Sequence, residues 1–466
     1  MALENTHYGA KLIQERIKDC HSLFFIGIGG ISMSSLAQIS LLEGYRVGGS
    51  DRNDNAQTKH LSALGAEIFC GHAADHLAGY DAVIYTVAIG EDNPEYVAAV
   101  ERGIPVISRA DYLGYLMMRY RHRIGVAGMH GKSTCTAMCA HIFLEAVDPT
   151  VLCGAELPDF GGSTCRIGGA RDHFIFEACD YMDSFLDFSP TLAIVLNVDL
   201  DHVDYFASIE QVRHSFLQYA RRTGEQGTVL LNADDCESVL SMEPFHGKKV
   251  TFGIESSADY QAKNLKPSPN GTDFDLYCKG LFLCRISLPV SGRHNVYNAL
   301  AASASALMCG ISPETVAGAL RSFRGAGRRM ERKGMLGGAT VYDDYGHHPV
   351  EIKATLNAAK SMGYERVLCA YQPHTYSRTA GLFSEFCEAL SGADRVFLAD
   401  IYAAREQNIY GVSSVDLAER IGDSACYCGG FGALARAIKE EAQAGDLVII
   451  MGAGDIFKVF DLLDLQ

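Results

Sequence analysis

The stretch Gly128-Met129-His130-Gly131-Lys132-Ser133-Thr134 decides the fold of the middle of the chain, because it joins two kinds of segment. Apolar residues 124–127 precede it, as expected of a buried strand, and a helical pattern begins at Cys135. Glycines let backbone N–H groups approach phosphate oxygens closely, and the N-terminus of a helix adds partial positive charge. Lys132 would then reach the outer phosphates of a nucleotide, while a hydroxyl group of Ser133 or Thr134 would hold Mg²⁺. The stretch therefore predicts a phosphate-binding loop in an α/β domain.

This loop departs from the common nucleotide-binding template at one position. The template has a glycine where this chain has Val126, so a shorter pattern, G-x-x-G-K-S, remains. A tight turn between a strand and a helix, with a lysine on the surface, is the alternative interpretation. The motifs found elsewhere in the chain favour the phosphate-binding loop.

Length and composition limit the classes of protein that fit. The 466 residues suggest about three domains of roughly 150 residues each. The formal net charge of −16 argues against nucleic acid or an anionic membrane as a partner. Fifteen cysteines without a CxxC pair or a signal peptide indicate reduced thiols, and hence a cytoplasmic protein. The apolar runs are too short and too interrupted to span a bilayer, so we expect no membrane insertion.

A second glycine-rich stretch, residues 27–34, follows the apolar residues 23–26 and leads into a helical pattern. It is similar to a dinucleotide-binding fingerprint, but Ser32 replaces the third glycine. The next predicted strand ends at Asp51, whose carboxylate would meet a ribose or the edge of a base. An NAD site and a nucleotide-sugar site both place a diphosphate at a helix N-terminus. The glycines leave these two alternatives open, together with a purely structural turn.

Acidic residues follow two predicted strands of the middle segment. Glu177 ends the apolar run 174–176, and residues 197–205, which include His202, follow the apolar run 192–196. The carboxyl ends of parallel strands are where open α/β sheets bind ligands, and Mg²⁺ prefers oxygen ligands. The pattern predicts a magnesium site beside the phosphate-binding loop. Taken alone, Glu177 reads as a solvated acid and His202 as a structural histidine.

Two further features complete the middle segment. Residues 273–277 and 281–284 alternate around Lys279-Gly280, which predicts a β-hairpin in an otherwise parallel pattern. Asn295 and Asn298 lie three residues apart at the start of an alanine-rich helix, so they share one face of it. Paired amides of this kind can bind the edge of adenine, and helix capping by Asn295 is the alternative.

The last segment, of about 140 residues, is predicted to be a third α/β unit, with strands near residues 340–343, 367–370, 396–399 and 447–451 and helical patterns such as residues 380–390 between them. Histidines gather near the strand ends together with Arg378. Zinc ligation is conceivable, but histidines without cysteines and next to an arginine favour recognition of an anion. These histidines are His347, His348 and His374.

Together the motifs resemble those of the Mur ligase family, and the resemblance runs from Gly27 to Gly454, nearly the whole chain. Each motif is weak alone, whereas their order and spacing are highly specific. The matching stretches are residues 27–34, 128–134, 177–181, 201–206, 292–298, 328–331, 343–349 and 372–378.

The resemblance implies three α/β domains. A Rossmann-like N-terminal domain, residues 1–120, would bind a UDP-sugar. A central domain like those of P-loop ATPases, residues 121–326, would carry the β-hairpin and bind ATP. A Rossmann-like C-terminal domain, residues 327–466, would bind an amino acid.

The resemblance also assigns roles to individual residues. Those implied to bind the UDP-sugar are Gly29, Gly30, Ser32, Met33, Ser34, Asp51, Thr86 and Arg109. Those implied to bind ATP are Gly128, Met129, His130, Gly131, Lys132, Ser133, Thr134, His294, Asn295, Asn298, Arg329 and Asp344. Mg²⁺ is assigned to Ser133, Thr134, Glu177 and His202, and catalysis to His130, Lys132, Glu177, His202 and Arg329. The amino acid is assigned to Tyr345, His347 and Arg378.

The activity implied is that of an ATP-dependent ligase in the synthesis of peptidoglycan precursors. The lactyl carboxylate of UDP-N-acetylmuramate would attack ATP, and L-alanine would then displace phosphate from the resulting acyl phosphate. Relatives that add later amino acids carry a carbamate-forming lysine, yet no lysine occurs between His202 and Lys248. This absence favours the alanine-adding branch of the family. Many members of that branch have a second arginine where this chain has Thr375.

Three other functions remain open on the sequence. A murein-peptide recycling ligase of the same family would accept a tripeptide in place of alanine. An NAD-dependent oxidoreductase of nucleotide-sugars would use the first glycine stretch, but it leaves Gly131-Lys132-Ser133 unexplained. A non-catalytic nucleotide-binding module would release no ADP with all substrates present.

Overall fold

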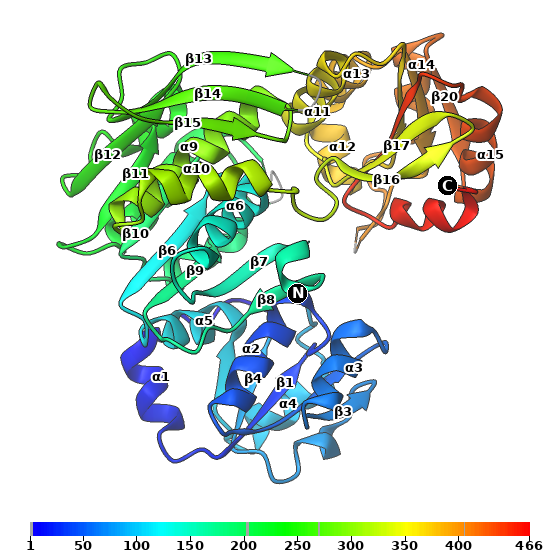
Figure 1. Ribbon diagram of the computed structural model, residues 1–466. Helices are drawn as coiled ribbons and strands as arrows, with labels where there is room; N and C mark the ends of the chain where they lie inside the picture. Colours follow the sequence, from blue (N-terminus) through cyan, green and yellow to red (C-terminus); the bar gives the residue numbers. More distant parts are fainter. Residues whose placement is uncertain (1–2, 202–204, 269–270, 405) are drawn as a thin grey trace.

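The computed structural model describes residues 3–201, 205–268, 271–404 and 406–466. The described residues form three α/β domains, each built around its own sheet, with the first domain (blue) and the third (yellow to red) at either end of the central one (Figure 1). None of the helices in these ranges combines the length and the apolar character needed to cross a membrane.

The first domain has a five-stranded parallel sheet in the order β3-β2-β1-β4-β5. The strand order reverses at β1, where open α/β sheets bind ligands, and the first glycine stretch follows this strand directly. Its strands are β1 Ser22–Ile26, β2 Arg46–Asp51, β3 Glu67–Cys70, β4 Ala82–Tyr85 and β5 Val106–Ser108. Its helices are α1 Gly9–Ile17, α2 Ile31–Leu42, α3 Ala56–Ala63, η1 Ala74–Leu77, α4 Pro94–Glu101 and α5 Arg109–Met117.

The central domain has a ten-stranded sheet in the order β15-β14-β13-β12-β11-β10-β6-β9-β7-β8. Strand β6 pairs in parallel with both β9 and β10, so the loops after these three strands meet at one edge. Its strands are β6 His122–Ala127, β7 Thr150–Leu157, β8 Ser163–Arg166, β9 His173–Glu177, β10 Leu192–Val195, β11 Thr228–Asn232, β12 Lys248–Gly253, β13 Tyr260–Ser268, β14 Gly271–Cys278 and β15 Leu281–Leu288. Its helices are α6 Lys132–Leu144, η2 Pro158–Phe160, η3 Tyr181–Asp187, α7 Ile209–Arg221, α8 Cys236–Met242, α9 Arg293–Met308 and α10 Pro313–Ser322.

The predicted β-hairpin is confirmed at β14 and β15, which pair antiparallel. The two turn residues, Lys279 and Gly280, have φ angles of 48° and 79°. Positive φ at both positions is typical of a type I′ turn, whose twist matches that of the strands it joins. Strand β13 extends the antiparallel part of the sheet beside β14, which the sequence patterns did not predict.

The third domain has a six-stranded sheet in the order β16-β17-β21-β18-β19-β20, parallel except for the edge strand β16. The helix expected over residues 380–390 is interrupted, since Leu382 has φ −119° and ψ 29° next to Gly381, a poor helix former. Its strands are β16 Glu331–Leu336, β17 Ala339–Asp344, β18 Val367–Tyr371, β19 Arg395–Ala399, β20 Ala425–Gly429 and β21 Leu447–Met451. Its helices are α11 Pro349–Ser361, α12 Tyr376–Gly381, α13 Phe383–Leu390, α14 Ser414–Ile421, α15 Phe431–Glu441 and η4 Ile456–Leu462.

The apolar cores show which domains pack as one unit. One cluster of buried side chains runs from Ile13 of the first domain to Phe245 of the central domain without interruption. Helix α2 packs on β7 and β8, and α5 packs on η3. The two clusters of the third domain contain only residues of that domain. The first and central domains therefore share a core, whereas the third domain has cores of its own.

Candidate active site

The predicted phosphate-binding loop connects β6 to α6, as expected. Gly128 and Gly131 have φ angles of 146° and 84°, which residues with a Cβ atom rarely adopt. A Cβ atom on Gly131 would also lie 2.6 Å from the Oδ1 atom of Asn298 on α9. The loop therefore needs glycine at Gly131 for two independent reasons, and it packs directly against the helix that carries the two predicted asparagines.

Asn197, which follows β10, holds the middle of this loop. Its Oδ1 atom accepts the His130 N–H at 2.8 Å, and its Nδ2 atom donates to the His130 carbonyl at 2.9 Å. The sequence patterns assigned no role to Asn197, although it is the first polar residue after the neighbouring strand. These two bonds fix the backbone of His130 relative to the sheet.

Lys132 lies inside the loop and is paired with a buried carboxylate. Its Nζ atom donates to Gly128 O at 2.6 Å, Met129 O at 3.2 Å and Asp180 Oδ1 at 2.9 Å. Burial alone would lower the pKa of Lys132, but Asp180 raises it above its ordinary value. Lys132 is therefore charged, and Asp180, whose side chain is fully buried, is a functional candidate that the sequence patterns missed.

Oxygen ligands suited to magnesium gather beside the loop. Glu177 ends β9, and its Oε1 atom lies 3.3 Å from Cys153 Sγ, which also lies 3.6 Å from the Ser133 carbonyl oxygen. The backbone carbonyl of Ser133, at the start of α6, and the Glu177 carboxylate thus flank one thiol, and Ser133 adds its hydroxyl group to these oxygen donors. This donor set suits Mg²⁺. His202, the other predicted metal ligand, lies outside the described residues.

A cavity of about 780 Å³ extends from the loop to the third domain. On its central-domain side, Asn298 donates to Asn295 Oδ1 at 3.3 Å, and Asn295 donates to Ser291 O at 2.7 Å. Burial lowers the pKa of His294 to about 4, so this imidazole is neutral near pH 7. The volume is in the range of sites for small ligands. The predicted ATP-binding residues that line it are His130, Gly131, Thr134, His294, Asn295, Asn298, Arg329 and Asp344.

The third domain closes this cavity with Asp344 and with Arg329, which lies in the connection before β16. The guanidinium group of Arg329 lies 4.8 Å from the centre of the Tyr345 ring and 3.4 Å from Ser133 Oγ. Asp344 accepts the N–H groups of Met330 at 2.9 Å and Gly346 at 2.8 Å. Burial raises the pKa of Asp344, although Arg329 opposes the shift. Arg329 therefore reaches from the third domain to the phosphate-binding loop.

The residues predicted to bind an amino acid lie together. The His347 ring is 5.6 Å from the Tyr345 ring and 6.0 Å from the His374 ring, and Arg378 Nη1 is 3.3 Å from His374 Nδ1. Burial lowers the pKa of His347 to about 4. Arg378 also donates to Asp201 of the central domain at 3.1 Å, and both side chains are buried. The cluster lies at the boundary between two domains, where the charge of Arg378 is paired with that of Asp201.

The first glycine stretch forms a tight cradle. The Gly29 N–H group donates to Asp51 Oδ2 at 2.9 Å, and the Gly29 carbonyl accepts from Asn55 Nδ2 at 3.0 Å. A Cβ atom on Gly29 would lie 2.7 Å from Asn55 Nδ2 and 2.9 Å from Asp51 Oδ2, so a larger residue would displace these side chains. Of the other predicted residues in this stretch, Met33 has its side chain buried in the apolar core.

Three more predicted residues of the first domain lie around this cradle. Arg109 donates to Ser32 Oγ at 3.1 Å. Burial lowers the pKa of Arg109, while Cys179 and Asp187 of the central domain oppose the shift. Thr86 lies beside Gly27, where a Cβ atom would approach its methyl group to 2.9 Å. Arg109 therefore lies where the first domain faces the loop after Glu177.

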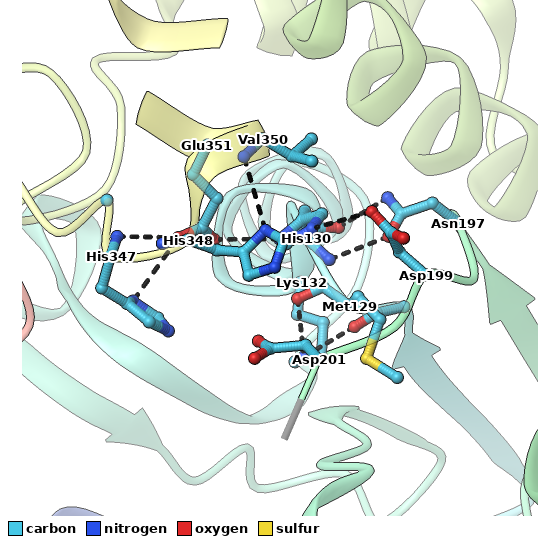
Figure 2. A network of polar contacts seen from close by, with 12 residues as sticks. Met129, His130, Lys132, Asn197, Asp199, Asp201, His347, His348, Val350 and Glu351 are labelled. Atoms are coloured by element: carbon cyan, nitrogen blue, oxygen red, sulfur yellow. Dashed lines mark hydrogen bonds and ion pairs between the residues drawn. The ribbon is translucent and has the colours of Figure 1, made fainter. Parts of the chain in front are cut away.

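His130 also meets side chains of the third domain and of the segment after β10, of which Glu351 was not singled out by the sequence patterns (Figure 2). Its Nδ1 atom is 3.4 Å from Glu351 Oε1, its Nε2 atom is 3.9 Å from Asp199 Oδ2, and its ring is 4.8 Å from the His348 ring. Burial alone would lower the pKa of His130, but Asp199 and Glu351 raise it to about 9. His130 is therefore an imidazolium near pH 7.

Two histidine clusters have donor atoms within 4.8 Å of one another in the described part of the chain. His130, His348 and Asp199 offer two imidazoles and one carboxylate, a set that suits Mg²⁺ poorly. The other cluster is His122, His173 and Cys309, at the opposite end of β6 and β9. The rings of His122 and His173 are stacked with planes 18° apart, so their in-plane lone pairs do not converge on one ion.

Family models match three consecutive parts of the chain. They are the catalytic domain of the Mur ligase family over residues 23–121, the Mur ligase middle domain over residues 126–306, and the glutamate ligase domain of Mur ligases over residues 328–454. A UDP-N-acetylmuramate–L-alanine ligase of Clostridium novyi (strain NT) is 43% identical over 442 residues, which cover 94% of this chain and 96% of the relative. The chain belongs to the Mur ligase family.

Solved structures of Mur ligases have the same three-domain fold. A UDP-N-acetylmuramate–alanine ligase from Thermotoga maritima superposes with a TM-score of 0.79 at 28% identity, covering 95% of this chain and 97% of that one. A murein peptide ligase from Psychrobacter arcticus 273-4 gives a TM-score of 0.74 at 25% identity, with 95% and 98% covered. The predicted fold class, three α/β domains with a hairpin in the central one, is confirmed.

Proposed function

We propose that the chain is an ATP-dependent ligase that joins L-alanine to the lactyl carboxylate of UDP-N-acetylmuramate and produces ADP and phosphate. One observation carries the proposal: the phosphate-binding loop of the central domain lies beside Arg329 of the third domain, and Arg378 of the third domain pairs with Asp201 of the central domain. The relative from Clostridium novyi, which is named for this activity, supports it over nearly the whole chain.

Each domain has a separate task in this proposal. Residues 1–120 bind the UDP part of the sugar in the cradle between Gly29 and Asp51. Residues 121–326 bind ATP, with adenine beside Asn295 and Asn298. Residues 327–466 bind the amino acid beside Arg378. The fifteen free cysteines support a cytoplasmic location, where thiols stay reduced.

The first chemical step activates the carboxylate. One lactyl oxygen attacks the γ-phosphorus of ATP, the bond to the β–γ bridging oxygen breaks, and an acyl phosphate and ADP result. Such a transfer depends on charge neutralisation and in-line positioning more than on covalent help. Lys132, which lies inside the loop, the loop N–H groups, and Arg329, which lies 3.4 Å from Ser133 Oγ, would supply the positive charge.

The second step forms the amide bond. The uncharged amine of L-alanine attacks the acyl carbon, and inorganic phosphate leaves. Arg378 would hold the carboxylate of L-alanine with a two-pronged contact, as guanidinium groups do. The neighbouring His347 is neutral near pH 7, so it does not repel the ammonium group of L-alanine as the amino acid binds.

Magnesium fits the site because the hydroxyl groups of Ser133 and Thr134, at the start of α6, and the carboxylate of Glu177, at the end of β9, are oxygen ligands. When bound there, Mg²⁺ would neutralise phosphate charge during the transfer. We propose these three residues as its ligands, together with His202.

The test is the release of ADP from a panel of UDP-sugars and amino acids. We expect release only when ATP, UDP-N-acetylmuramate and L-alanine are all present. An equal steady-state rate of ADP production without the amino acid would exclude the ligase. The absence of any ADP release with all three substrates would favour a non-catalytic nucleotide-binding module.

A murein-peptide ligase is the second candidate, since the structure from Psychrobacter arcticus has the same fold at 25% identity. Such an enzyme would accept a tripeptide at the site that we assign to L-alanine. Comparing kcat/KM for the two acceptors decides between them. The NAD-dependent oxidoreductase is set aside, because the Mur ligase models account for all three domains.

A further inference from the structure

Glu351 has two sets of contacts that lie in different domains (Figure 2). It lies in the first turn of α11, where its Oε2 atom accepts the N–H groups of His347 at 3.0 Å and His348 at 3.3 Å. Its Oε1 atom lies 3.4 Å from Nδ1 of His130 in the phosphate-binding loop. One oxygen therefore caps the helix of the third domain, while the other faces the central domain.

Helix capping alone does not require the second contact. A capping glutamate needs only to accept a backbone N–H group, and glutamine does this equally well. Yet the Glu351 side chain is only 14% exposed, and burial of a carboxylate is costly unless a cation is nearby. Burial alone would raise the pKa of Glu351, but His347 and His130 hold it well below its ordinary value. The contact between Glu351 and His130 therefore depends on the negative charge of the carboxylate, which helix capping does not require.

His130 is the complementary partner on the central domain. Two hydrogen bonds from Asn197 fix the backbone of His130, and hence the position from which its side chain extends. Both ring nitrogens are inaccessible to solvent and make no hydrogen bond within the described residues. The nearest charged atoms are those of Glu351 at 3.4 Å and Asp199 at 3.9 Å. The ring therefore takes its orientation from carboxylates on both domains.

We propose that Glu351 is a positioning residue that fixes the docked third domain against the phosphate-binding loop by holding the His130 ring. This inference rests on the proposed function, because it names how the amino-acid domain is aligned with the phosphate-transfer site of that reaction. Glu351 lines the cavity, and in this proposal it acts on the reaction through His130.

The test compares Glu351→Gln with Glu388→Gln. Glutamine preserves the helix cap but removes the charge. Glu388 lies on α13 of the same domain, and its exposed carboxylate pairs with Lys353, so it is a matched control. We expect Glu351→Gln to lower kcat about ten- to a hundredfold, the scale of one charge-assisted contact, with KM for ATP changed less than about twofold. Glu388→Gln should behave as the unmodified chain does.

A double-mutant cycle with His130→Asn tests the route of the effect. If Glu351 acts through His130, Glu351→Gln lowers kcat no further in the His130→Asn background. Reductions in kcat that multiply would overturn the proposal, as would a normal kcat in Glu351→Gln. Glu351→Asp, which keeps the charge on a shorter side chain, should recover part of the rate.

Small-angle scattering gives a readout that does not depend on activity. The radius of gyration of Glu351→Gln without ligands should exceed that of Glu388→Gln, because the third domain is held less firmly. Equal radii together with a normal kcat would refute the positioning role. If the unmodified chain releases no ADP, the proposed function fails, and the scattering comparison still decides whether Glu351 holds the domain.

Discussion

Lys132 and Glu177 are the two charged side chains on which phosphate transfer depends in the proposed function. Lys132 is paired with the buried Asp180, whereas Glu177 contacts Cys153 and the Gly154 N–H group. We predict that Lys132→Ala and Glu177→Ala each lower kcat at least about a hundredfold, the scale of losing one charge-stabilising group. Steady-state ADP release measures this effect.

The two variants differ in what they leave behind. Lys132→Ala leaves Asp180 buried without its lysine, so its thermal unfolding must be measured beside its activity. Glu177→Ala leaves that pair intact and therefore isolates the effect on catalysis. Near-normal turnover in Glu177→Ala would show that the magnesium site lies elsewhere.

Arg378 provides the second prediction at the residue scale. Lysine cannot reproduce the two parallel bonds of a guanidinium with a carboxylate. We predict that Arg378→Lys raises KM for L-alanine roughly ten- to a hundredfold, as expected from a loss of about 1.5–3 kcal/mol, with KM for ATP nearly unchanged. Initial rates at varied L-alanine measure it. A KM for L-alanine within about twofold of normal would mean that Arg378 serves only its ion pair with Asp201.

Sequence patterns predicted the residues whose role is local and missed those whose role depends on distant partners. The glycines of the loop and the Asn295–Asn298 pair follow from spacing along one turn or one helix. Asn197 and Glu351 contact His130 although they lie 67 and 221 residues after it in the sequence. No local sequence pattern encodes a contact over such a separation. The same is true of Asp180, the partner of Lys132.

At the scale of elements, Asp234 holds the connection that follows β12. Its carboxylate accepts the N–H groups of Ile254 at 2.6 Å, Glu255 at 2.9 Å and Ser256 at 2.6 Å, and the Tyr297 hydroxyl group donates to it at 2.9 Å. Burial alone would raise the pKa of Asp234, but these bonds hold it far below its ordinary value. A single side chain thus ties a loop to α9, which lines the cavity.

We predict that Asp234→Asn destabilises the chain by about 1–3 kcal/mol at pH 7, the cost of weakening bonds to a charged acceptor. Because the pKa is depressed in the folded state, this contribution is fully present above the ordinary pKa of about 4 and is lost as the pH falls below it. Urea unfolding at pH 7 and at lower pH measures it. The difference between Asp234→Asn and the unmodified chain should shrink on acidification, and a constant difference would contradict the prediction.

Elements were predicted well where one pattern dominates and poorly where context decides. The buried strands β1, β6 and β10 are short apolar runs, and the hairpin has a turn with its own signature. The break at Leu382 follows a single glycine within a helical pattern that is otherwise continuous, and the antiparallel edge strand β16 has no periodic pattern that separates it from a loop. The pairing of an edge strand is set by the surrounding fold rather than by local preference.

At the scale of the whole molecule, the cores predict how the chain unfolds. The first and central domains share one apolar cluster, while the two clusters of the third domain contain only its own residues. Domains that share a core unfold together, and those with separate cores unfold independently. We therefore predict two transitions in differential scanning calorimetry of the ligand-free chain. A single transition whose calorimetric and van't Hoff enthalpies agree would contradict this.

The cavity of about 780 Å³ lies across this division, since its walls include Asn298 of the central domain and Asp344 of the third. A ligand seated there binds both cooperative units at once and has no complete site on either alone. Its binding energy is then available only while both remain folded, so it couples two melting events that are otherwise independent. A non-hydrolysable ATP analogue should accordingly reduce the temperature difference between the two calorimetric peaks, because the bound nucleotide links two units that otherwise unfold separately.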